Sequence, residues 1–414
     1  MKQNIWILNH YATNMFFDQS GRHYWFAENL IKKGYKPTIF CASTNHFSDN
    51  HVDMYNKLFS ENSVDNIPFV FVKTPEYQGN RKKRLINMLS FYKRLFKTTE
   101  EYAILHGKPD VIIASSVHPL TLVAGIKIAK KFGIPCICEV RDLWPESIVA
   151  YGSLKRNSVI AKMLYLGERW IYKNADAVIM TWEGGKQYVI DQGWNKQIDL
   201  DKIIHISNGV VIDSFDRNSQ EHVIIDKDLD DEKYKNLVYA GSIRKVNNLG
   251  LVLDAAKIIQ DYDSKIRFLI YGSGDEKEML EQRCKDNSIS NVIFKGRVEK
   301  KMIPSILKKS YANILHNSST SLDKYGQSQN KFFEYLAAGK PIIQTYSTSY
   351  SIVEKYHCGI SAINQNPQEI AEIILEVCKN SQESDFMGIN ARKASYEFDF
   401  SSLTNKLIRV IENI

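Results

Sequence analysis

Short apolar runs alternate with longer amphipathic stretches along the whole chain. In each amphipathic stretch the apolar residues recur at the spacing of a helix. This alternation is typical of β-α units arranged on parallel sheets. The first half of the chain predicts strands at residues 4–8, 37–42, 68–72, 110–115, 135–140 and 177–181. The second half restarts the pattern, with strands predicted at 236–241, 266–272, 291–296, 311–316 and 341–346.

The restart of the pattern predicts two domains. A chain of 414 residues is also too long for one ordinary hydrophobic core. The segment 201–220 contains an Asn-Gly turn and a polar run, so we place the boundary at Asn208, between domains of residues 1–207 and 208–397. Open α/β sheets bind ligands beyond the carboxyl ends of their strands, so functional residues are expected in the loops that follow the strands.

The composition is that of a soluble globular protein, with 44% hydrophobic and 24% charged residues. The six cysteines are scattered without a C-x-x-C pair, which favours a reducing compartment and gives neither a disulfide framework nor a zinc site. The first residues read as a strand and not as a signal peptide, and no apolar run approaches the length of a membrane span. We therefore expect a cytoplasmic protein.

Positive charge is concentrated in one segment of the first half. No Asp or Glu lies between Glu76 and Glu100, whereas residues 81–97 contain many Lys and Arg. Apolar residues recur there at helical spacing, at Leu85, Met88, Leu89, Tyr92 and Phe96. The segment 81–97 therefore predicts a basic amphipathic helix, which either lies on an anionic membrane surface or packs its stripe on the domain core. Nucleic acid is not an expected partner, because no nucleic-acid-binding module accompanies the segment.

Two glycine turns in the second half follow predicted strands and precede predicted helices. The first contains Gly241 and Ser242 with Arg244 and Lys245 close behind, and the second is 272–275, Gly-Ser-Gly-Asp. Glycines let backbone N–H groups approach a ligand, and helix N-termini favour phosphate. An ordinary β-α connection is the competing interpretation of a lone G-x-G. The two cations favour a diphosphate site at the first turn.

The segment 328-SQNKFFEYLAAGKPII-343 predicts a helix over residues 329–338, with Ser328 as N-cap and Gly339 after its end. Its polar residues fall on one narrow stripe that contains Asn330, Lys331 and Glu334. A carboxylate on such a seam can accept hydrogen bonds from the vicinal hydroxyls of a ribose. The competing interpretation is a surface ion pair between Lys331 and Glu334.

Three loops at predicted strand ends of the first half carry polar residues. They are 139-EVRDLWPES-147, the turn around His118, and the helix start at Gly21, Arg22 and His23. A single histidine is more often structural, but the convergence of three such loops favours function. The sequence contains no Ser-His-Asp order, no H-E-x-x-H motif and no clustered metal ligands, so we expect no metal cofactor.

Taken together, several motifs resemble the retaining glycosyltransferases of family four, which have the GT-B fold of two Rossmann-like domains. The resemblance covers nearly the whole chain. The motifs are 20-SGRHYWFAENLIKKGY-35, 141-RDLWPES-147, 206-ISNGV-210, 239-YAGS-242, 251-LVLDAAKII-259, 271-YGSGDE-276 and 331-KFFEYLAAGKPII-343. The second and last resemble the branch of bacterial N-acetyl-L-fucosaminyl transferases, which build O-antigen and capsule repeats on undecaprenyl diphosphate.

The resemblance implies a UDP-sugar donor in the second domain and a lipid-linked saccharide acceptor in the first. It implies that Glu334 binds the ribose, that Gly272 and Gly274 lie against the base, and that the Gly241 loop with Lys331 holds the diphosphate. Further donor contacts are then expected from Ser242, Ser328, Gln329 and Asn330. Acceptor contacts are expected from Gly21, Arg22, His23, Arg141 and Asp142. Catalytic roles fall to Arg244, Lys245, Lys331 and His118. The helix 398–414 would pack back on the first domain.

The chain departs from the family pattern at two places. The usual Arg and Lys of the first glycine turn align with Ser242 and Asn247, so Arg244 and Lys245 would have to replace them. The first acid of the E-x7-E motif aligns with Gly326, for which Asp323, Gln327 and Gln329 are possible substitutes. The alternatives are a nucleotide-sugar epimerase, a non-catalytic GT-B partner subunit, and a nicotinamide oxidoreductase, which the lack of a third glycine disfavours.

Overall fold

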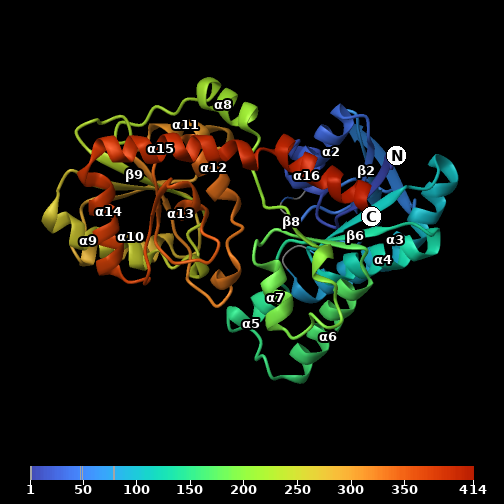
Figure 1. The fold of residues 1–414 in the computed structure, drawn as a ribbon. Helices are drawn as coiled ribbons and strands as arrows, with labels where there is room; N and C mark the ends of the chain where they lie inside the picture. Colours follow the sequence, from blue (N-terminus) through green and yellow to red (C-terminus); the bar gives the residue numbers. More distant parts are fainter. Residues whose placement is uncertain (1, 47, 49, 78–79) are drawn as a thin grey trace. The chain divides into compact units, whose positions relative to one another are not determined.

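The computed structural model describes residues 2–46, 48, 50–77 and 80–414. The chain forms two compact units, one of residues 1–207 with 400–414 and the other of residues 208–399. Each unit is built on one sheet with helices on both faces (Figure 1). The strands of the first sheet are parallel except for the edge strand β3 (Phe59–Val64), and those of the second sheet are all parallel. The predicted fold class, two Rossmann-like parallel-sheet domains, is confirmed.

The sheet of the first unit has eight strands in the order β3-β4-β2-β1-β5-β6-β7-β8. Its strands are β1 (Asn4–Leu8), β2 (Lys36–Ala42), β3 (Phe59–Val64), β4 (Ile67–Val72), β5 (Val111–Ser115), β6 (Cys136–Val140), β7 (Ala177–Met180) and β8 (Ile203–His205). The sequence missed β3 and β8. The strand β3 is polar and half exposed because it pairs antiparallel with β4 at the sheet edge, so it lacks the apolar run of a buried strand.

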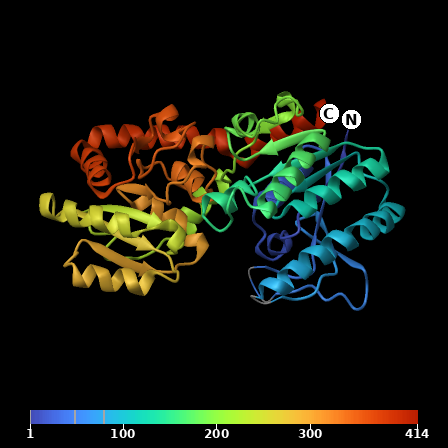
Figure 2. The ribbon, with the colours of Figure 1, turned by 90° about the horizontal axis from the view of Figure 1, so that it is seen from below.

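Helices cover the two faces of this sheet. They are α1 (Thr13–Asp18), α2 (Arg22–Lys32), α3 (Arg81–His106), α4 (Pro119–Phe132), α5 (Glu146–Ala150), α6 (Val159–Asn174), α7 (Gly185–Asp191) and α16 (Phe400–Asn413), with a 3₁₀ turn η1 (Leu200–Lys202). Right-handed crossovers place α3, α4 and α6 side by side on one face (Figure 2). On the other face α16 packs on α2, where Phe400 contacts Trp25 and Phe26.

The basic segment 81–97 forms the first part of the long helix α3, as predicted. The helix begins after Asn80, whose side chain caps the first turn, and it continues to His106. Its buried stripe is Asn87, Phe91, Leu95, Thr98 and Tyr102. Leu85 and Leu89 of the predicted stripe are exposed together with Ile86, so these residues do not pack on the domain core. The alternative, that they contact a membrane surface, stays a prediction. Periodicity alone did not identify the core face of the helix. The side chain of Arg81 lies outside the described residues.

The sheet of the second unit has the order β11-β10-β9-β12-β13-β14. Its strands are β9 (Lys235–Ala240), β10 (Ile266–Tyr271), β11 (Val292–Gly296), β12 (Ala312–Leu315), β13 (Ile342–Gln344) and β14 (Gly359–Ser361). The sequence missed the three-residue edge strand β14. The strands that were predicted, in both units, are confirmed to within two residues at either end.

Two apolar layers sandwich this second sheet, one on each face. One layer contains α8 (Ile212–Glu221), α11 (Ile303–Lys309), α12 (Asn330–Ala338), α13 (Ile352–Tyr356) and α15 (Ser381–Ser395). The other contains α9 (Gly250–Tyr262), α10 (Lys277–Asp286) and α14 (Pro367–Lys379). The 3₁₀ turns are η2 (Lys245–Asn247), η3 (Lys300–Met302), η4 (Asp323–Tyr325) and η5 (Tyr396–Phe398). Within the described residues, no helix is long and apolar enough to cross a membrane.

Candidate functional site

The helix α12 anchors the candidate donor site in the second unit. Four large side chains of α12 are fully buried, namely Phe332, Phe333, Tyr335 and Leu336. The helix ends where Gly339 adopts the left-handed conformation at φ 67°, as predicted. Its start differs from the prediction, because Gln329 occupies the N-cap and Ser328 does not. The Ser328 hydroxyl and carbonyl oxygens instead accept hydrogen bonds from the Asn208 amide, at 3.1 and 2.7 Å.

Glu334 lies on the polar seam of α12. Its side chain is partly buried, and this burial raises the pKa of the carboxyl group, against a smaller opposing effect of Lys300. Among the described residues its carboxylate has no hydrogen-bond or ion-pair partner. The alternative expected from the sequence, a pair with Lys331, is not formed, because the Lys331 ammonium bonds to Tyr239 and His316. A partly buried carboxylate without a partner is costly unless a ligand supplies donors. The seam is therefore suited to a polyhydroxy ligand.

Lys331 connects α12 with the end of the sheet. Its ammonium donates to the carbonyl oxygen of His316 at 3.1 Å and to the Tyr239 hydroxyl at 3.3 Å, and it lies 4.3 Å from the centre of the Tyr239 ring. A Cβ placed on Gly241 would lie 3.4 Å from this ammonium, so Lys331 borders the Gly241 loop. Burial lowers the pKa of Lys331 to about 7. The position is suited to an ammonium that becomes fully charged when an anion binds.

The glycines of the two turns serve close packing between the loops. A Cβ on Gly272 would lie 1.8 Å from the carbonyl oxygen of Gly241, and one on Gly274 would lie 1.9 Å from that of Ile243. The N–H groups of Gly241 and Gly272 donate to Tyr271 and Gly296 at 3.0 and 2.8 Å. These two N–H groups are thus already bonded, so they cannot serve a phosphate in this arrangement. The sequence identified the glycines, but not this reason for them.

The two positions at which the resemblance led us to expect Arg and Lys are Ser242 and Asn247, and they form a neutral pair. The Ser242 hydroxyl donates to the side-chain oxygen of Asn247 at 3.1 Å, so the two positions lie next to each other. Arg244 and Lys245 come between them in the chain, at the start of η2, and both side chains are exposed. Cations at these exposed positions are accessible to an anionic ligand.

Gly326 cannot easily be replaced by an acid, because its φ of 101° is strained for any side chain. Of the three possible substitutes, Asp323 is already engaged, since its carboxylate accepts from the Ser319 hydroxyl and the Thr320 N–H at 2.9 and 2.7 Å. The other two are the amides of Gln327 and Gln329.

Both amides bond to one tyrosine and leave one polar atom unused. The Gln329 amide donates to the Tyr346 hydroxyl at 2.8 Å, and that hydroxyl donates to Gln327 at 3.2 Å. The remaining Nε2 of Gln327 and Oε1 of Gln329 are buried without a partner in the described structure. Buried unpaired amide atoms at the start of α12 are candidates for ligand contacts.

In the first unit the expected acceptor residues surround a buried acid, Glu139, at the end of β6. Arg22 donates to one of its oxygens at 2.7 Å, and His23 and Ser115 contact the other at 2.7 Å each. Burial alone would raise the pKa of Glu139, but the charges of Arg22 and His23 outweigh it and hold the pKa well below its ordinary value. Arg22 and His23 are themselves buried, so they position Gly21 and the start of α2 and do not present their side chains to solvent.

His118 lies directly before α4 and is 7% exposed. Its Nε2 lies 2.8 Å from Nδ1 of His10, and its Nδ1 is buried without a partner in the described structure. Burial and the charge of Arg84 lower the pKa of His118 to about 4, so the ring is neutral at pH 7. The sequence missed His10, which no motif singled out.

A cavity of about 90 Å³ adjoins His118 at the carboxyl ends of β5 and β6. Its lining includes Ser116, His118, Asp142, Trp144, Glu168 and Tyr172. The hydroxyls of Tyr172 and Tyr188 donate to Glu168 at 2.6 and 2.8 Å, and burial raises the pKa of Glu168 to about 8. Asp142 is exposed and Arg141 is partly exposed beside it. The cavity offers small polar and apolar surfaces next to His118 and Asp142.

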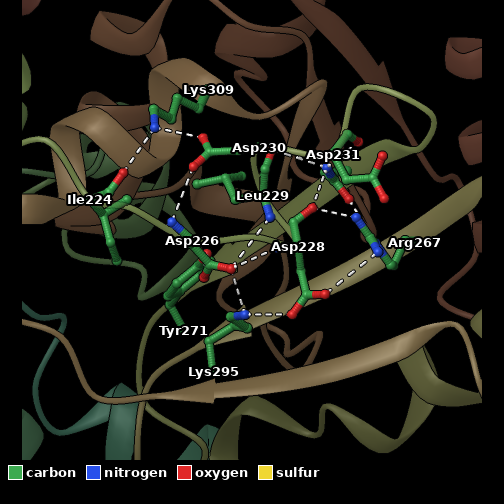
Figure 3. Close-up of polar contacts among 11 residues, drawn as sticks. Ile224, Asp226, Asp228, Leu229, Asp230, Asp231, Arg267, Tyr271, Lys295 and Lys309 are labelled. Carbon is green, nitrogen blue, oxygen red and sulfur yellow. Dashed lines mark hydrogen bonds and ion pairs between the residues drawn. The ribbon is translucent and has the colours of Figure 1, made fainter.

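An acidic loop at residues 226–231 has the spacing of a cation site, but ammonium groups already occupy it. Lys295 lies 2.6 Å from Asp226 and 2.7 Å from Asp228, and Lys309 lies 2.6 Å from Asp230 (Figure 3). The loop therefore links β11 and α11 through ion pairs. No group of three or more metal-binding side chains occurs among the residues described.

The expected residues thus gather in two separate groups. The second unit holds Lys331, Glu334 and the Gly241, Gly272 and Gln329 segments, and the first unit holds His118, the Gly21 turn and the Asp142 loop. Sequence reasoning missed Tyr239, His316 and Glu168, which contact or border these groups. The only signal for Tyr239 and His316 was their place at predicted strand ends.

Family models match both halves of the chain. The model described as "Glycosyltransferase Family 4" matches residues 24–214, and the one described as "Glycosyl transferases group 1" matches residues 220–394. An uncharacterized glycosyltransferase of Methanocaldococcus jannaschii is 22% identical over 223 residues, which cover 52% of this chain and 60% of that relative's length.

Solved structures share the fold over the whole chain. HepE of Anabaena in complex with UDP has a TM-score of 0.68 at 14% identity and covers 100% of both chains. Sucrose-phosphate synthase of Thermosynechococcus elongatus has a TM-score of 0.69 at 14% identity and covers 99% of this chain and 98% of that one. The trehalose-6-phosphate protein of Escherichia coli bound with UDP-2-fluoro glucose has a TM-score of 0.71 at 10% identity and covers 99% of each chain.

Proposed function

We propose, from the premise that this chain is a glycosyltransferase with the GT-B fold, that it moves a sugar from a UDP-sugar to a lipid-linked saccharide. The sugar is an N-acetylated amino sugar, and the acceptor is carried on undecaprenyl diphosphate in the synthesis of a surface polysaccharide such as capsule or O-antigen. The observation that carries the proposal is the partly buried, unpartnered carboxylate of Glu334 on the seam of α12.

The donor site is assigned to the second unit. Glu334 accepts hydrogen bonds from the two ribose hydroxyls, and Lys331, one turn earlier on α12, contacts the diphosphate. Arg244 and Lys245 supply further positive charge from η2, in place of the neutral pair Ser242 and Asn247. UDP bound to HepE of Anabaena, which shares the fold, supports a uridine nucleotide as the ligand class.

The reaction requires no protein nucleophile. The bond between the anomeric carbon and the donor phosphate breaks, and the acceptor hydroxyl oxygen bonds to that carbon on the same face. The leaving phosphate takes the hydroxyl proton, so UDP departs with the proton and the configuration is retained. Lys331, Arg244 and Lys245 stabilise the negative charge that develops on the leaving diphosphate. The proposal uses no metal cofactor.

The acceptor site is assigned to the first unit. Glu139 holds Arg22 and His23 and so fixes the turn at Gly21, while Asp142 and the neutral His118 border the cavity. A neutral imidazole can accept a hydrogen bond from an acceptor hydroxyl and so orient it. We assign Arg141, which is partly exposed beside Asp142, to an acceptor phosphate.

An enzyme that acts on a lipid-linked acceptor meets it at a membrane surface. We assign contact with that surface to the helix α3. It exposes Leu85, Ile86 and Leu89, with Lys82 and Lys83 in the same turns. Near its other end the helix also exposes Ile104 and Leu105. We assign the protein to the inner face of the cell membrane as a peripheral protein.

The test is turnover of a panel of UDP-sugars against a lipid-diphosphate saccharide, with products read by mass spectrometry. The proposal expects one UDP-N-acetylamino sugar to be transferred with retention of configuration. Binding of UDP without transfer to any acceptor would instead indicate a non-catalytic GT-B subunit. Epimerised nucleotide sugar without acceptor would indicate an epimerase.

A further inference from the structure

The outward side of α6 carries a continuous stripe of large apolar side chains. Val159, Ile160, Met163 and Leu166 expose 74, 62, 66 and 55% of their surface, and Trp170 exposes 38%. Their spacing along the helix places all five on one face. At a rise of about 1.5 Å per residue, the stripe is about 16 Å long. We call these five residues the α6 ridge.

The α6 ridge is not needed to hold the helix in place. The opposite side of α6 is already buried, with Ala161, Glu168, Ile171 and Tyr172 packed toward the interior. Tyr172 also donates to Glu168 there. Single exposed apolar side chains are common on soluble proteins, but five in one stripe usually mark a contact surface.

Most charged side chains around the ridge are positive, and one of them, Arg156, is paired with the carboxylate of Glu146 at 2.6 Å. Residues 154–174 contain five cations, Lys155, Arg156, Lys162, Arg169 and Lys173, and a single acid, Glu168. That acid is 4% exposed, so the outward face of α6 presents no carboxylate. A sixth cation comes from α4, where the Lys130 ammonium lies 5.9 Å from the Trp170 ring. The partner of the ridge is therefore expected to combine apolar groups with negative charge.

An anionic bilayer surface has this combination. Helices that lie in the headgroup region pair an apolar stripe with flanking Lys and Arg and often carry Trp at the interface. The exposed part of α3 points to the same partner, because α3 and α6 flank α4 in one helix layer (Figure 2). Both helices start at the carboxyl edge of the sheet, where the His118 and Asp142 loops lie.

We propose that the α6 ridge inserts into the headgroup region of an anionic bilayer, and that α3 and α6 together hold the carboxyl edge of the first sheet against the lipid. This inference deepens the proposed function, because it supplies the surface on which a lipid-linked acceptor is met. The apolar residues enter the bilayer, while the flanking cations pair with lipid phosphates.

The experiment is binding of the full-length protein to vesicles of phosphatidylglycerol and phosphatidylcholine, compared with vesicles of phosphatidylcholine alone. The test variant is Ile160→Glu/Met163→Glu, whose positions are exposed and therefore tolerate charge. The matched control is Ile225→Glu/Ile363→Glu, which places the same charges at exposed positions of the second unit. Leu85→Glu/Ile86→Glu separates the contribution of α3. Turnover of a short-chain, water-soluble acceptor is measured for each variant.

The proposal expects the wild type and the control to bind anionic vesicles, and the α6 variant to bind them at least roughly tenfold more weakly. The α3 variant weakens binding separately, and the two changes combine. Turnover of the soluble acceptor is expected to stay at the wild-type level in the α6 variant. This turnover tests the proposed chemistry, whereas vesicle binding tests the membrane contact, so the two can fail independently. Unchanged vesicle binding, equal binding to neutral vesicles, or a wild-type dimer that the α6 variant dissociates would each overturn the inference.

Discussion

The Lys331 ammonium donates to the carbonyl oxygen of His316 at 3.1 Å, directly after β12. A carbonyl oxygen does not neutralise a charge, so burial dominates and lowers the pKa of Lys331 to about 7. A bound diphosphate would raise this pKa again, because an opposite charge favours the charged form of the amine. Donor binding by this site is therefore coupled to proton uptake.

We predict that affinity for a UDP-sugar falls as the pH rises above about 7. Below pH 7 Lys331 is charged in both the free and the bound state, so binding is then independent of its titration. Above pH 7 the free state loses the proton that the bound state keeps, and affinity falls by up to about tenfold per pH unit. Titration calorimetry at pH 6 to 9 measures this slope. The variant Lys331→Arg removes the slope, and an identical slope in that variant would contradict the assignment.

Glu168 gives a second prediction, on stability. Its folded pKa of about 8 lies above its unfolded value, so the protein holds a proton that the unfolded chain releases between about pH 4.5 and 8. Stability is therefore lost as the pH rises through this window, by up to about 1.4 kcal/mol per unit. The titratable side chains that affect the pKa of Glu168 are those of Tyr172, Tyr188, Glu146 and Arg156.

The variant Glu168→Gln keeps a neutral group of the same shape. We expect it to match the wild type near pH 5 and to melt several degrees higher at pH 8, as measured by thermal unfolding across this range. If the difference in melting temperature between the variant and the wild type were the same at every pH, Glu168 would not carry the proton.

A third prediction concerns the unpaired amide oxygen of Gln329. If this amide contacts the donor sugar, Gln329→Ala weakens binding of the UDP-sugar about tenfold, the loss expected for one hydrogen bond. Binding of UDP itself stays within about twofold, because the nucleotide contacts remain. Calorimetry with both ligands compares the loss of affinity for the UDP-sugar with the loss for UDP. An equal loss for UDP and the UDP-sugar would place Gln329 at the nucleotide instead.

The sequence predicted the strands well where burial on both faces forces a continuous apolar run, as in β1 and β10. It missed β3, which is polar because one edge faces solvent. It did not identify the core face of α3, because Leu85 and Phe91 are equally apolar and only the tertiary contacts place Phe91 inside. Propensity and periodicity are local, whereas these choices depend on the neighbouring elements.

The candidate site shows the same difference between local properties, which the sequence predicts, and tertiary contacts, which it does not. The polar seam of α12 and its end at Gly339 followed from the spacing of residues, since both are properties of one helix. The contacts between segments could not be predicted from the sequence. The sequence could not show that Ser328 bonds to Asn208 and leaves the N-cap to Gln329, or that Gly272 is required by the backbone of Gly241.

The central claim is that Glu334 binds the ribose of a uridine nucleotide, and UDP affinity of the variant Glu334→Ala tests it most directly. The matched control is Glu376→Ala, an exposed acid on α14 in the same unit. We predict that UDP binding measured by calorimetry weakens about 10- to 100-fold in Glu334→Ala, with an unchanged melting temperature and wild-type affinity in the control. Wild-type UDP affinity in a folded Glu334→Ala protein would contradict the account.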